Sequence, residues 1–323
     1  MDRKVVVLSN WMNEKQKGKI LQTAEDCGFT CLFFNNEPEA KAENVLADAE
    51  VVFGFAPETA AGSTSLKWLC LPSAGADVFV KPGAIRSEET ILTNSSGAYG
   101  ATLAEHMVMQ TLMLLRRMPE FQEGIRRREW LPPREQASVK DSRVTVLGTG
   151  DIGGCYARRI RGFEPEQIVG VNRSGKCTDP AFDRILPWTK LDEILPETDI
   201  LAMSLPGTPE TAGILSAERI ALLPETAYVI NVGRGSAIDE AALSKALNEG
   251  RLAGAALDVM QHEPLPKEDP LWETKNVILT PHVAGNMTIP FTKNRAVEMF
   301  CEDLENYAAG RPMKYLVNRK LGY

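Results

Sequence analysis

Two successive series of short apolar runs, separated by helix-like stretches, constrain the fold of this chain more than any other feature. The first series has strand-like segments at 5–8, 31–34, 51–55, 68–71 and 90–94. The second begins at Arg143, with strand-like segments at 144–147, 168–171, 200–205, 227–232, 254–259 and 276–280. Strands that alternate with helices predict parallel sheets with helices on both faces. The sequence therefore predicts an α/β fold, and a length of 323 residues favours two domains.

Two longer helices are predicted outside the two series. Residues 101–118 contain neither Gly nor Pro and are strongly apolar, which predicts a long buried helix. A polar stretch follows, and we interpret it as a short helix and a surface arm in which Arg126, Arg127 and Arg128 are solvated. Residues 289–310 predict a second long helix near the end of the chain.

Composition excludes several classes of protein. No run of about 18 apolar residues is present, so we expect no membrane span. No secretory signal is visible, which makes the cytoplasm the default location. The net charge of −7 argues against a nucleic-acid partner, because such proteins need a basic surface. The six cysteines are scattered, so we expect reduced thiols and no metal site.

A glycine-rich turn lies between the predicted strand at 144–147 and the helix that follows it. Gly148, Gly150 and Gly153 have the spacing of the dinucleotide fingerprint. In that motif the first glycine permits a tight turn, the second lets the backbone approach a pyrophosphate, and the third lets helix and strand pack closely. The strand context therefore predicts that this turn binds a dinucleotide cofactor.

The residues after the next strand indicate which dinucleotide is preferred. NAD-binding proteins usually place an acid there for the ribose hydroxyls, but this chain has Asn172, Arg173 and Ser174. No Asp or Glu occurs from Gln167 to Thr178. Because these side chains suit a 2′-phosphate and no carboxylate would repel it, we predict NADP as the preferred cofactor, with NAD possible.

Three charged side chains follow three predicted strands of the second series. Arg234 comes after 227–232, Glu263 after 254–259 and His282 directly after 276–280. Residues just past the carboxyl ends of parallel strands face the ligand crevice, so His282 is the best acid–base candidate. An arginine can grip a carboxylate at two points, and a glutamate beside a histidine orients its ring. Of the other two histidines, His262 lies in a polar loop, and we expect His106 to serve helix packing or an interface.

The motifs together resemble the D-isomer-specific 2-hydroxyacid dehydrogenase family. The matching stretches include VLGTGDIG, VINVGRGSAIDEAAL, GAALDVMQHEPLPKEDPLW and NVILTPHVAGN, and they extend over most of residues 93–286. The family's catalytic arginine, glutamate and histidine fall on Arg234, Glu263 and His282. Its nicotinamide-amide aspartate falls on Asp258, and its substrate-carboxylate loop on 71–77, where the backbone of Ala74 and Gly75 would bind substrate.

The resemblance also implies an architecture and a set of cofactor contacts. Two Rossmann-like or flavodoxin-like domains are expected: 1–99 plus 288–323 for substrate, and 100–287 for the dinucleotide. A homodimer through the dinucleotide domain is implied, with 101–118 and the basic arm as candidate interface. The implied cofactor contacts are Gly148, Gly150, Asp151, Ile152, Gly153, Asn172, Arg173, Ser174, Leu205, Pro206, Thr211, Val232, Arg234, Asp258, His282 and Gly285.

The activity implied is the NAD(P)-dependent interconversion of a small 2-oxo acid and its D-2-hydroxy acid, with His282 as acid and base and the substrate held between the domains. Phe53, Phe55 and Tyr99 are candidate walls of a small substrate pocket, which favours glyoxylate or hydroxypyruvate; phosphoglycerate is a further candidate by resemblance. Two alternatives stay open: a phosphite dehydrogenase on the same fold, and a nucleotide-sensing, corepressor-like scaffold. Glu263 argues against a formate dehydrogenase, which carries Gln at that position.

Overall fold

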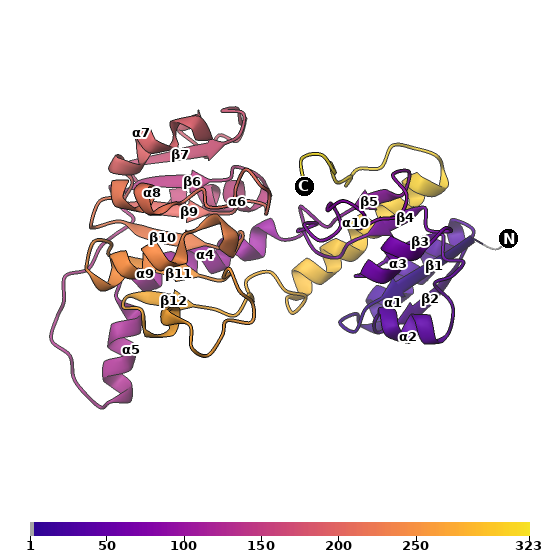
Figure 1. Ribbon diagram of the computed structural model, residues 1–323, viewed down its shortest axis with the longest axis horizontal. Helices are drawn as coiled ribbons and strands as arrows, with labels where there is room; N and C mark the ends of the chain where they lie inside the picture. The colour runs from indigo at the N-terminus through magenta and orange to yellow at the C-terminus, as the bar shows by residue number, and fades with distance from the viewer. Residues whose placement is uncertain (1–2) are drawn as a thin grey trace. The chain divides into compact units, whose positions relative to one another are not determined.

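The structure is a computed structural model that describes residues 3–323, and it divides into two units (Figure 1). Unit 1 comprises the residues up to Tyr99 together with Asn286–Tyr323, and unit 2 is Gly100–Gly285. Each unit is built on one sheet, of five strands in unit 1 and seven in unit 2, and neighbouring strands pair in parallel. The predicted α/β class is therefore confirmed.

The sheet of unit 1 has the order β2-β1-β3-β4-β5. Its strands are β1 (Arg3–Leu8), β2 (Phe29–Phe34), β3 (Val51–Phe53), β4 (Trp68–Cys70) and β5 (Ile91–Thr93). Its helices are α1 (Glu14–Asp26), α2 (Glu37–Ala42), α3 (Pro57–Gly62) and α10 (Pro290–Ala308). The start of α1 is fixed by a capping box, in which Asn13 accepts from the Gln16 backbone and Gln16 accepts in return from the Asn13 backbone.

The last helix completes the core of unit 1, because α10 places Phe300 against the sheet. The Phe300 ring stacks on Phe53 at a centroid separation of 4.4 Å and on Trp68 at 5.3 Å. The indole Nε1 of Trp68 donates to Thr93 Oγ1 at 2.9 Å, so its polar atom is satisfied inside the core. Residues from the two ends of the chain therefore form one hydrophobic core.

The sheet of unit 2 has the order β12-β11-β10-β9-β6-β7-β8. Its strands are β6 (Arg143–Leu147), β7 (Gln167–Asn172), β8 (Arg184–Pro187), β9 (Ile200–Met203), β10 (Tyr228–Asn231), β11 (Gly254–Leu257) and β12 (Val277–Leu279). The order reverses between β6 and β9, and ligands of such sheets bind at the carboxyl ends of the strands beside this reversal. The glycine-rich turn follows β6 directly.

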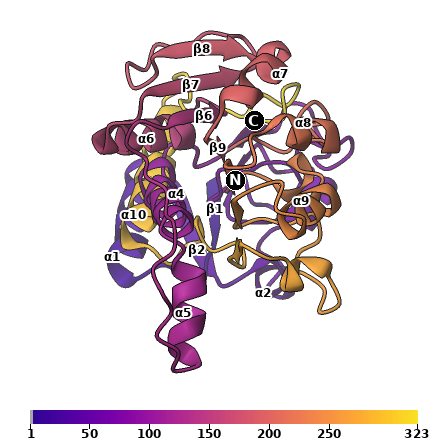
Figure 2. The same cartoon turned by 90° about the vertical axis from the view of Figure 1, so that its left-hand side faces the viewer.

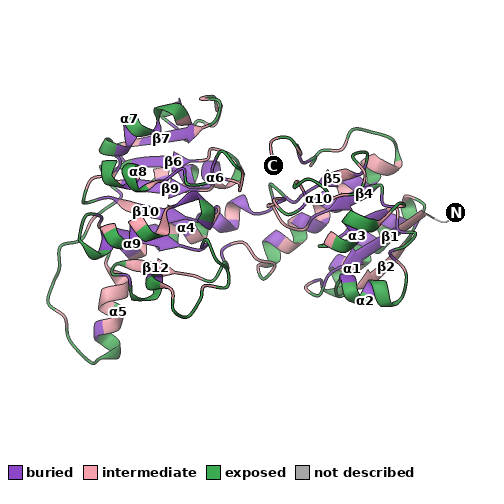
Figure 3. Ribbon diagram, viewed as in Figure 1, coloured by how far each residue is buried: buried purple, intermediate pink, exposed green. Residues whose placement is uncertain are grey.

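Helices cover both faces of the unit 2 sheet, with α4 and α6 on one face and α8 and α9 on the other (Figure 2). The helices of this unit are α4 (Gly100–Leu115), α5 (Met118–Arg126), α6 (Asp151–Ile160), α7 (Leu191–Ile194), α8 (Ala217–Leu222) and α9 (Glu240–Asn248). Burial follows this layering: the strands are buried and the outer helix faces are exposed (Figure 3).

The structure corrects several predicted boundaries. The helix expected at 101–118 ends at Leu115, and α5 starts at Met118, because Arg117 between them adopts a left-handed backbone with φ of 53°. Strand β3 ends at Phe53, two residues earlier than expected, and Gly54 follows it with φ of 151°. A side chain on Gly54 would meet Leu8, so the chain passes close to β1 at this point. Strand β8 was not predicted; it is only four residues long and only partly buried.

All six cysteines are free thiols, three of them buried and three half-buried. Burial raises the pKa of Cys31 and Cys70 to about 12, so neither thiol is ionised at neutral pH. Within residues 3–323, no helix combines the length and the apolar character needed to cross a membrane.

Candidate active site

The glycine-rich turn between β6 and α6 contains two glycines that the chain itself requires and one that it does not. Gly148 has φ of 101°, and a Cβ on Gly153 would overlap the carbonyl oxygen of Gly148. Gly150 differs, because its φ is ordinary and a Cβ there would meet no atom of the chain within 4 Å. A missing side chain at Gly150 leaves the N-terminus of α6 open to a group from outside, and that position in the fingerprint serves a pyrophosphate.

The carboxylate of the next residue in this turn, Asp151, binds the start of α4. Asp151 Oδ2 accepts from the backbone nitrogen of Gly100 at 2.8 Å, so it caps the start of α4. A side chain on Gly100 would overlap the same carboxylate. Ile152 is half-buried in the first turn of α6. Asp151 therefore couples the glycine-rich turn to α4.

The side-chain amide of Asn172, at the end of β7, forms hydrogen bonds within its own loop and to the glycine-rich turn. Its Nδ2 donates to Thr149 Oγ1 at 2.7 Å and to the Lys176 carbonyl at 2.9 Å. Its Oδ1 accepts from the backbone nitrogens of Ser174 at 3.0 Å and Gly175 at 2.7 Å. This amide closes an Asx-type turn and ties it to the glycine-rich turn. The neighbouring side chains of Arg173 and Ser174 are exposed.

The predicted contacts after β9 and β10 lie where their strands end. The backbones of Leu205 and Gly233 pack so closely that a Cβ on Gly233 would lie 2.6 Å from the nitrogen of Leu205. Leu205 and Val232 are buried. Thr211 Oγ1 donates to the Pro206 carbonyl at 2.6 Å, so its hydroxyl closes the loop after β9.

Glu263 and His282 come together beyond β11 and β12, which are neighbours in the sheet. Glu263 Oε2 lies 2.7 Å from His282 Nδ1, and Glu263 Oε1 accepts from the Met260 backbone nitrogen at 2.9 Å. The carboxylate is thus fixed by the chain while it holds one nitrogen of the imidazole. About half of the His282 side chain is exposed, at 49%, which leaves the ring accessible.

Arg234 lies in the loop after β10, the next strand of the same sheet. Its Nη1 donates to the Gly233 carbonyl at 2.8 Å, and the side chain is half-buried. A Cβ on the following Gly235 would overlap the carbonyl of Met260, so the arginine loop packs directly against the loop that carries Glu263. The three predicted catalytic residues therefore occupy loops after three adjacent strands.

The carboxylate of Asp258, only 1% exposed, organises the loop that carries His282. His282 has a left-handed backbone with φ of 51°, and its nitrogen donates to the Asp258 carbonyl at 2.8 Å. Asp258 Oδ1 accepts from Thr280 Oγ1 at 2.6 Å and from the Val283 nitrogen at 3.0 Å. Its Oδ2 accepts from the Ala284 nitrogen at 3.0 Å. A strained backbone persists only where its surroundings fix it, and here Asp258 does so.

The remaining histidines and the last predicted contact lie apart from this pair or behind it. His262 is exposed in the loop after β11. His106, on α4, has Nε2 3.8 Å from Asp258 Oδ1, so it packs against Asp258, whose hydrogen-bonded carboxylate we call the Asp258 hub. Gly285 is half-buried at the end of unit 2.

In unit 1 the predicted carboxylate loop follows β4 and is held through its carbonyl oxygens. Asn94 Nδ2 donates to the Ala74 carbonyl at 2.6 Å, and Ser73 Oγ donates to the Gly75 carbonyl at 2.8 Å. Tyr99 donates to the Pro72 carbonyl at 2.6 Å. The carbonyls are occupied, which orients the backbone N–H groups of this loop.

One predicted pocket wall is wrong. Phe53 is 1% exposed and stacks on Phe300, so it belongs to the core of unit 1. The β-strand alternation explains this, since Phe53 shares a face with Val51 and both point toward α10. Phe55 is 54% exposed and contacts Phe79 edge-on, while Tyr99 is buried.

Sequence reasoning missed the polar partners of Asp258 and of Asn172. Thr280 directly follows β12, so the rule that selected His282 also selects Thr280. Thr149 lies inside the glycine-rich turn, but no spacing indicates that its hydroxyl binds Asn172. For His106 the sequence predicts only helix packing or an interface, because the residue lies within an apolar helix.

We predict opposite effects of alanine at two glycines of the turn. Gly153→Ala should destabilise the protein by about 1–3 kcal/mol, because its Cβ overlaps backbone that cannot move freely. Gly150→Ala should leave Tm within about 2 °C of the parent, since it meets no atom of the chain. Thermal unfolding followed by circular dichroism checks both. Equal losses in Tm would show that Gly150 is also needed by the fold.

Comparisons with known proteins agree with this geometry. The sequence model of the D-isomer specific 2-hydroxyacid dehydrogenase, NAD binding domain, matches residues 108–284. A glyoxylate/hydroxypyruvate reductase A of Klebsiella pneumoniae (strain 342) is 35% identical over 226 residues, which are 69% of this chain and 70% of the relative.

Two solved structures resemble the whole chain. A D-isomer specific 2-hydroxyacid dehydrogenase of Xanthobacter autotrophicus Py2, in complex with NADPH and MES, has a TM-score of 0.83 at 28% identity and covers 100% of both chains. An NADPH-dependent glyoxylate/hydroxypyruvate reductase of Sinorhizobium meliloti, with NADP and sulfate, has a TM-score of 0.84 at 26% identity, covering 99% of this chain and 100% of the other. The chain therefore belongs to the D-isomer specific 2-hydroxyacid dehydrogenase family.

Proposed function

We propose that this protein reduces a small 2-oxo acid to its D-2-hydroxy acid with NADPH, using His282 as the acid and base. As a member of its family it is an NAD(P)-dependent oxidoreductase. The observation that carries the finer proposal is the 2.7 Å contact between His282 Nδ1 and Glu263 Oε2. This pair follows β11 and β12, and the glycine-rich turn follows β6 of the same sheet.

The reaction needs two contributions from the chain: a proton for the carbonyl oxygen, and a positive charge that binds the substrate carboxylate. A bound nicotinamide supplies the hydride for C2 of the oxo acid. Negative charge then grows on the carbonyl oxygen, and His282 Nε2 donates a proton to it while Glu263 stabilises the imidazolium. The guanidinium of Arg234 pairs with the substrate carboxylate at two points and polarises the ketone. In the oxidative direction His282 accepts the proton.

The loop after β4 offers a second element that suits a carboxylate. Because the carbonyls of Pro72, Ala74 and Gly75 accept from side chains, we assign the backbone N–H groups of Ala74 and Gly75 to the substrate carboxylate. Backbone N–H groups bind such oxygens without added charge.

A small substrate is supported by the names of related proteins. The Klebsiella relative is a glyoxylate/hydroxypyruvate reductase, and the Sinorhizobium structure carries the same description. We therefore propose glyoxylate and hydroxypyruvate as substrates. A phosphite dehydrogenase would oxidise phosphite with the same cofactor, and a panel that includes phosphite separates the two.

The cofactor proposal rests on two features of unit 2. Gly150 leaves an opening at the start of α6, and Arg173 and Ser174 are exposed beyond β7 on a turn closed by Asn172. These residues would hold the pyrophosphate and the 2′-phosphate of NADPH respectively. Asn172 positions this turn instead of contacting the ribose, because its amide is fully used.

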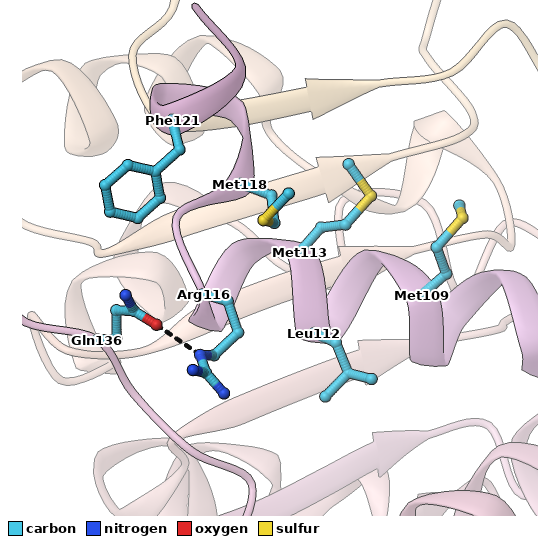
Figure 4. A pocket seen from close by; sticks show the side chains of 7 residues that line it. All are labelled: Met109, Leu112, Met113, Arg116, Met118, Phe121 and Gln136. Carbon is cyan, nitrogen blue, oxygen red and sulfur yellow. Dashed lines mark hydrogen bonds between the residues drawn. The ribbon is translucent and has the colours of Figure 1, made fainter. Parts of the chain in front are cut away.

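We further propose that the end of α4, α5 and the arm after it bind a second copy of this chain. A hollow on this surface is lined by side chains from α4, α5 and the arm (Figure 4), namely Met109, Leu112, Met113, Arg116, Met118, Phe121 and Gln136. Nearby, Ile125 is 66% exposed and Trp130 fully exposed, which is costly for an isolated chain. Next to Ile125, Arg126 and Arg127 form ion pairs with Glu123.

His282→Ala tests the reaction. The parent should oxidise NADPH when glyoxylate or hydroxypyruvate is added, and the variant should lose about 100-fold or more in kcat with nearly unchanged NADPH affinity. His262→Ala, in an exposed loop, is the matched control and should keep its activity. A loss of less than about tenfold at His282 would remove it from the acid–base role.

Arg173→Ala tests the cofactor preference. A charge-assisted contact to phosphate is worth about 1.5–3 kcal/mol, so kcat/KM with NADPH should fall about tenfold or more. The value with NADH should stay within about twofold, because NADH has no 2′-phosphate. Equal losses with both cofactors, or a parent that prefers NADH, would contradict the assignment.

The assembly is tested by a charge placed on the proposed interface. Ile125→Glu combined with Trp130→Glu should convert a dimer into a monomer, measured by size-exclusion chromatography with light scattering. Trp272→Glu is the control, since Trp272 is an exposed tryptophan of the same unit outside this surface. A parent that elutes as a monomer at micromolar concentration would refute the proposal.

A further inference from the structure

Helix α4 packs on β10 and β11 (Figure 1). It carries two polar side chains, His106 and Gln110, that lie against the loop of Asp258 and Thr280. His106 Nε2 lies 3.4 Å from Thr280 Oγ1 and 3.8 Å from Asp258 Oδ1. Gln110, one helical turn later, donates from Nε2 to the same Thr280 hydroxyl at 3.3 Å. Two α4 side chains therefore converge on one hydroxyl behind the loop that carries His282.

The direction of each hydrogen bond follows from the groups available. The Thr280 hydroxyl has one proton, and the short 2.6 Å contact assigns it to the Asp258 carboxylate. Its oxygen can then only accept, so the ring of His106 and the amide of Gln110 are the donors. The chain of donation runs from α4 to Thr280, then to Asp258, whose backbone and carboxylate hold His282 and the residues after it.

The burial of this cluster makes the arrangement unusual for simple packing. Gln110 and Asp258 are at most 1% exposed, and the His106 side chain is 14% exposed. Within residues 3–323, Gln110 Oε1 is the one buried side-chain nitrogen or oxygen without a hydrogen-bond partner. Buried polar groups are normally satisfied, and exceptions in native proteins call for a reason.

We propose that His106 is a positioning residue for the reaction: its Nε2–H holds Thr280 and Asp258 in the orientation that fixes the left-handed backbone at His282. This inference rests on the proposed function of His282. The contacts of His106 described above are with Thr280 and Asp258, and they do not include Glu263 or His282. It acts on His282 through Thr280 and Asp258.

The ring of His106 performs this role as a neutral donor. Burial lowers the pKa of His106 below the ordinary value of 6.5, and the opposing charge of Asp258 does not restore it. Asp258 is the charged group that acts on the ring. The adjacent Glu105 is exposed and pairs with Arg159 of α6 at 3.9 Å. A neutral amide can therefore replace the ring, provided that its nitrogen reaches Thr280.

Paired substitutions separate a donor role from a packing role. His106→Gln keeps an N–H donor at the same reach, whereas His106→Leu keeps apolar volume and removes the donor. The leucine variant should lose about ten- to a hundredfold in kcat, as expected for a misplaced catalytic group, with KM for the oxo acid within about threefold. The glutamine variant should retain most of the parent kcat. Equal losses in both, or an unchanged kcat in the leucine variant, would overturn the proposal.

Thr280→Val gives a second test if the leucine variant fails to fold. Valine preserves the volume and removes the hydroxyl, so kcat should fall while KM for the oxo acid stays within about threefold. An unchanged kcat with Thr280→Val would overturn the proposal. Far-ultraviolet circular dichroism and Tm establish that each variant is folded.

A spectroscopic measurement tests the coupling without turnover. The chain has three histidines, so ¹⁵N NMR of the imidazoles can resolve His106, His262 and His282 in the full-length protein. His106→Leu should shift the His282 ring resonances and leave those of His262 unchanged. No shift at His282 would overturn the proposal, even if the parent reduces oxo acids. A parent that fails to oxidise NADPH while the shift is present would instead contradict the proposed function.

Discussion

The buried carboxylate of Asp258 is the contact on which the geometry of the candidate active site depends. His282 has a left-handed backbone, which a non-glycine residue adopts only when its surroundings fix it. Asp258 provides that constraint through its carbonyl, which binds the His282 nitrogen, and through its carboxylate, which binds the two nitrogens that follow. A carboxylate that is 1% exposed would be costly without these donors. The hydrogen bonds that satisfy Asp258 are therefore the same ones that aim the histidine toward Glu263.

The proposed dinucleotide cradle rests on a different constraint, the close approach of backbone to backbone. Gly153 and Gly148 are glycines because the chain fills the space around them, whereas Gly150 faces open space. An unfilled position beside the N-terminus of α6 suits an external anion. Asp151 and Asn172 then connect this cradle to α4 and to the loop after β7. Both constraints act within the sheet of unit 2 and meet at the carboxyl ends of its strands.

Much of the fold can be predicted from the sequence, because the spacing of apolar residues and the positions of glycines in turns are local features. The apolar runs predict the α/β class, the resemblance of several motif stretches implies the dehydrogenase family, and both are confirmed. Positions just after strands also selected the pair Glu263 and His282, which lie in contact. Features set by tertiary contacts were missed: the helix break at Arg117, the inward face of Phe53, and the internal use of the Asn172 amide. For His106 the sequence predicts helix packing or an interface, because an apolar helix does not show which of its residues faces a polar loop.

The stereochemistry of the product tests the central claim most directly. Hydroxypyruvate reduced by this protein with NADPH gives glycerate, whose two hands are separated by chiral chromatography. The account predicts one D-glycerate formed for each NADPH consumed, because hydride and proton are delivered to a substrate whose carboxylate is fixed by Arg234. L-glycerate, a racemic product, or NADPH that stays unconsumed with both hydroxypyruvate and glyoxylate would contradict it.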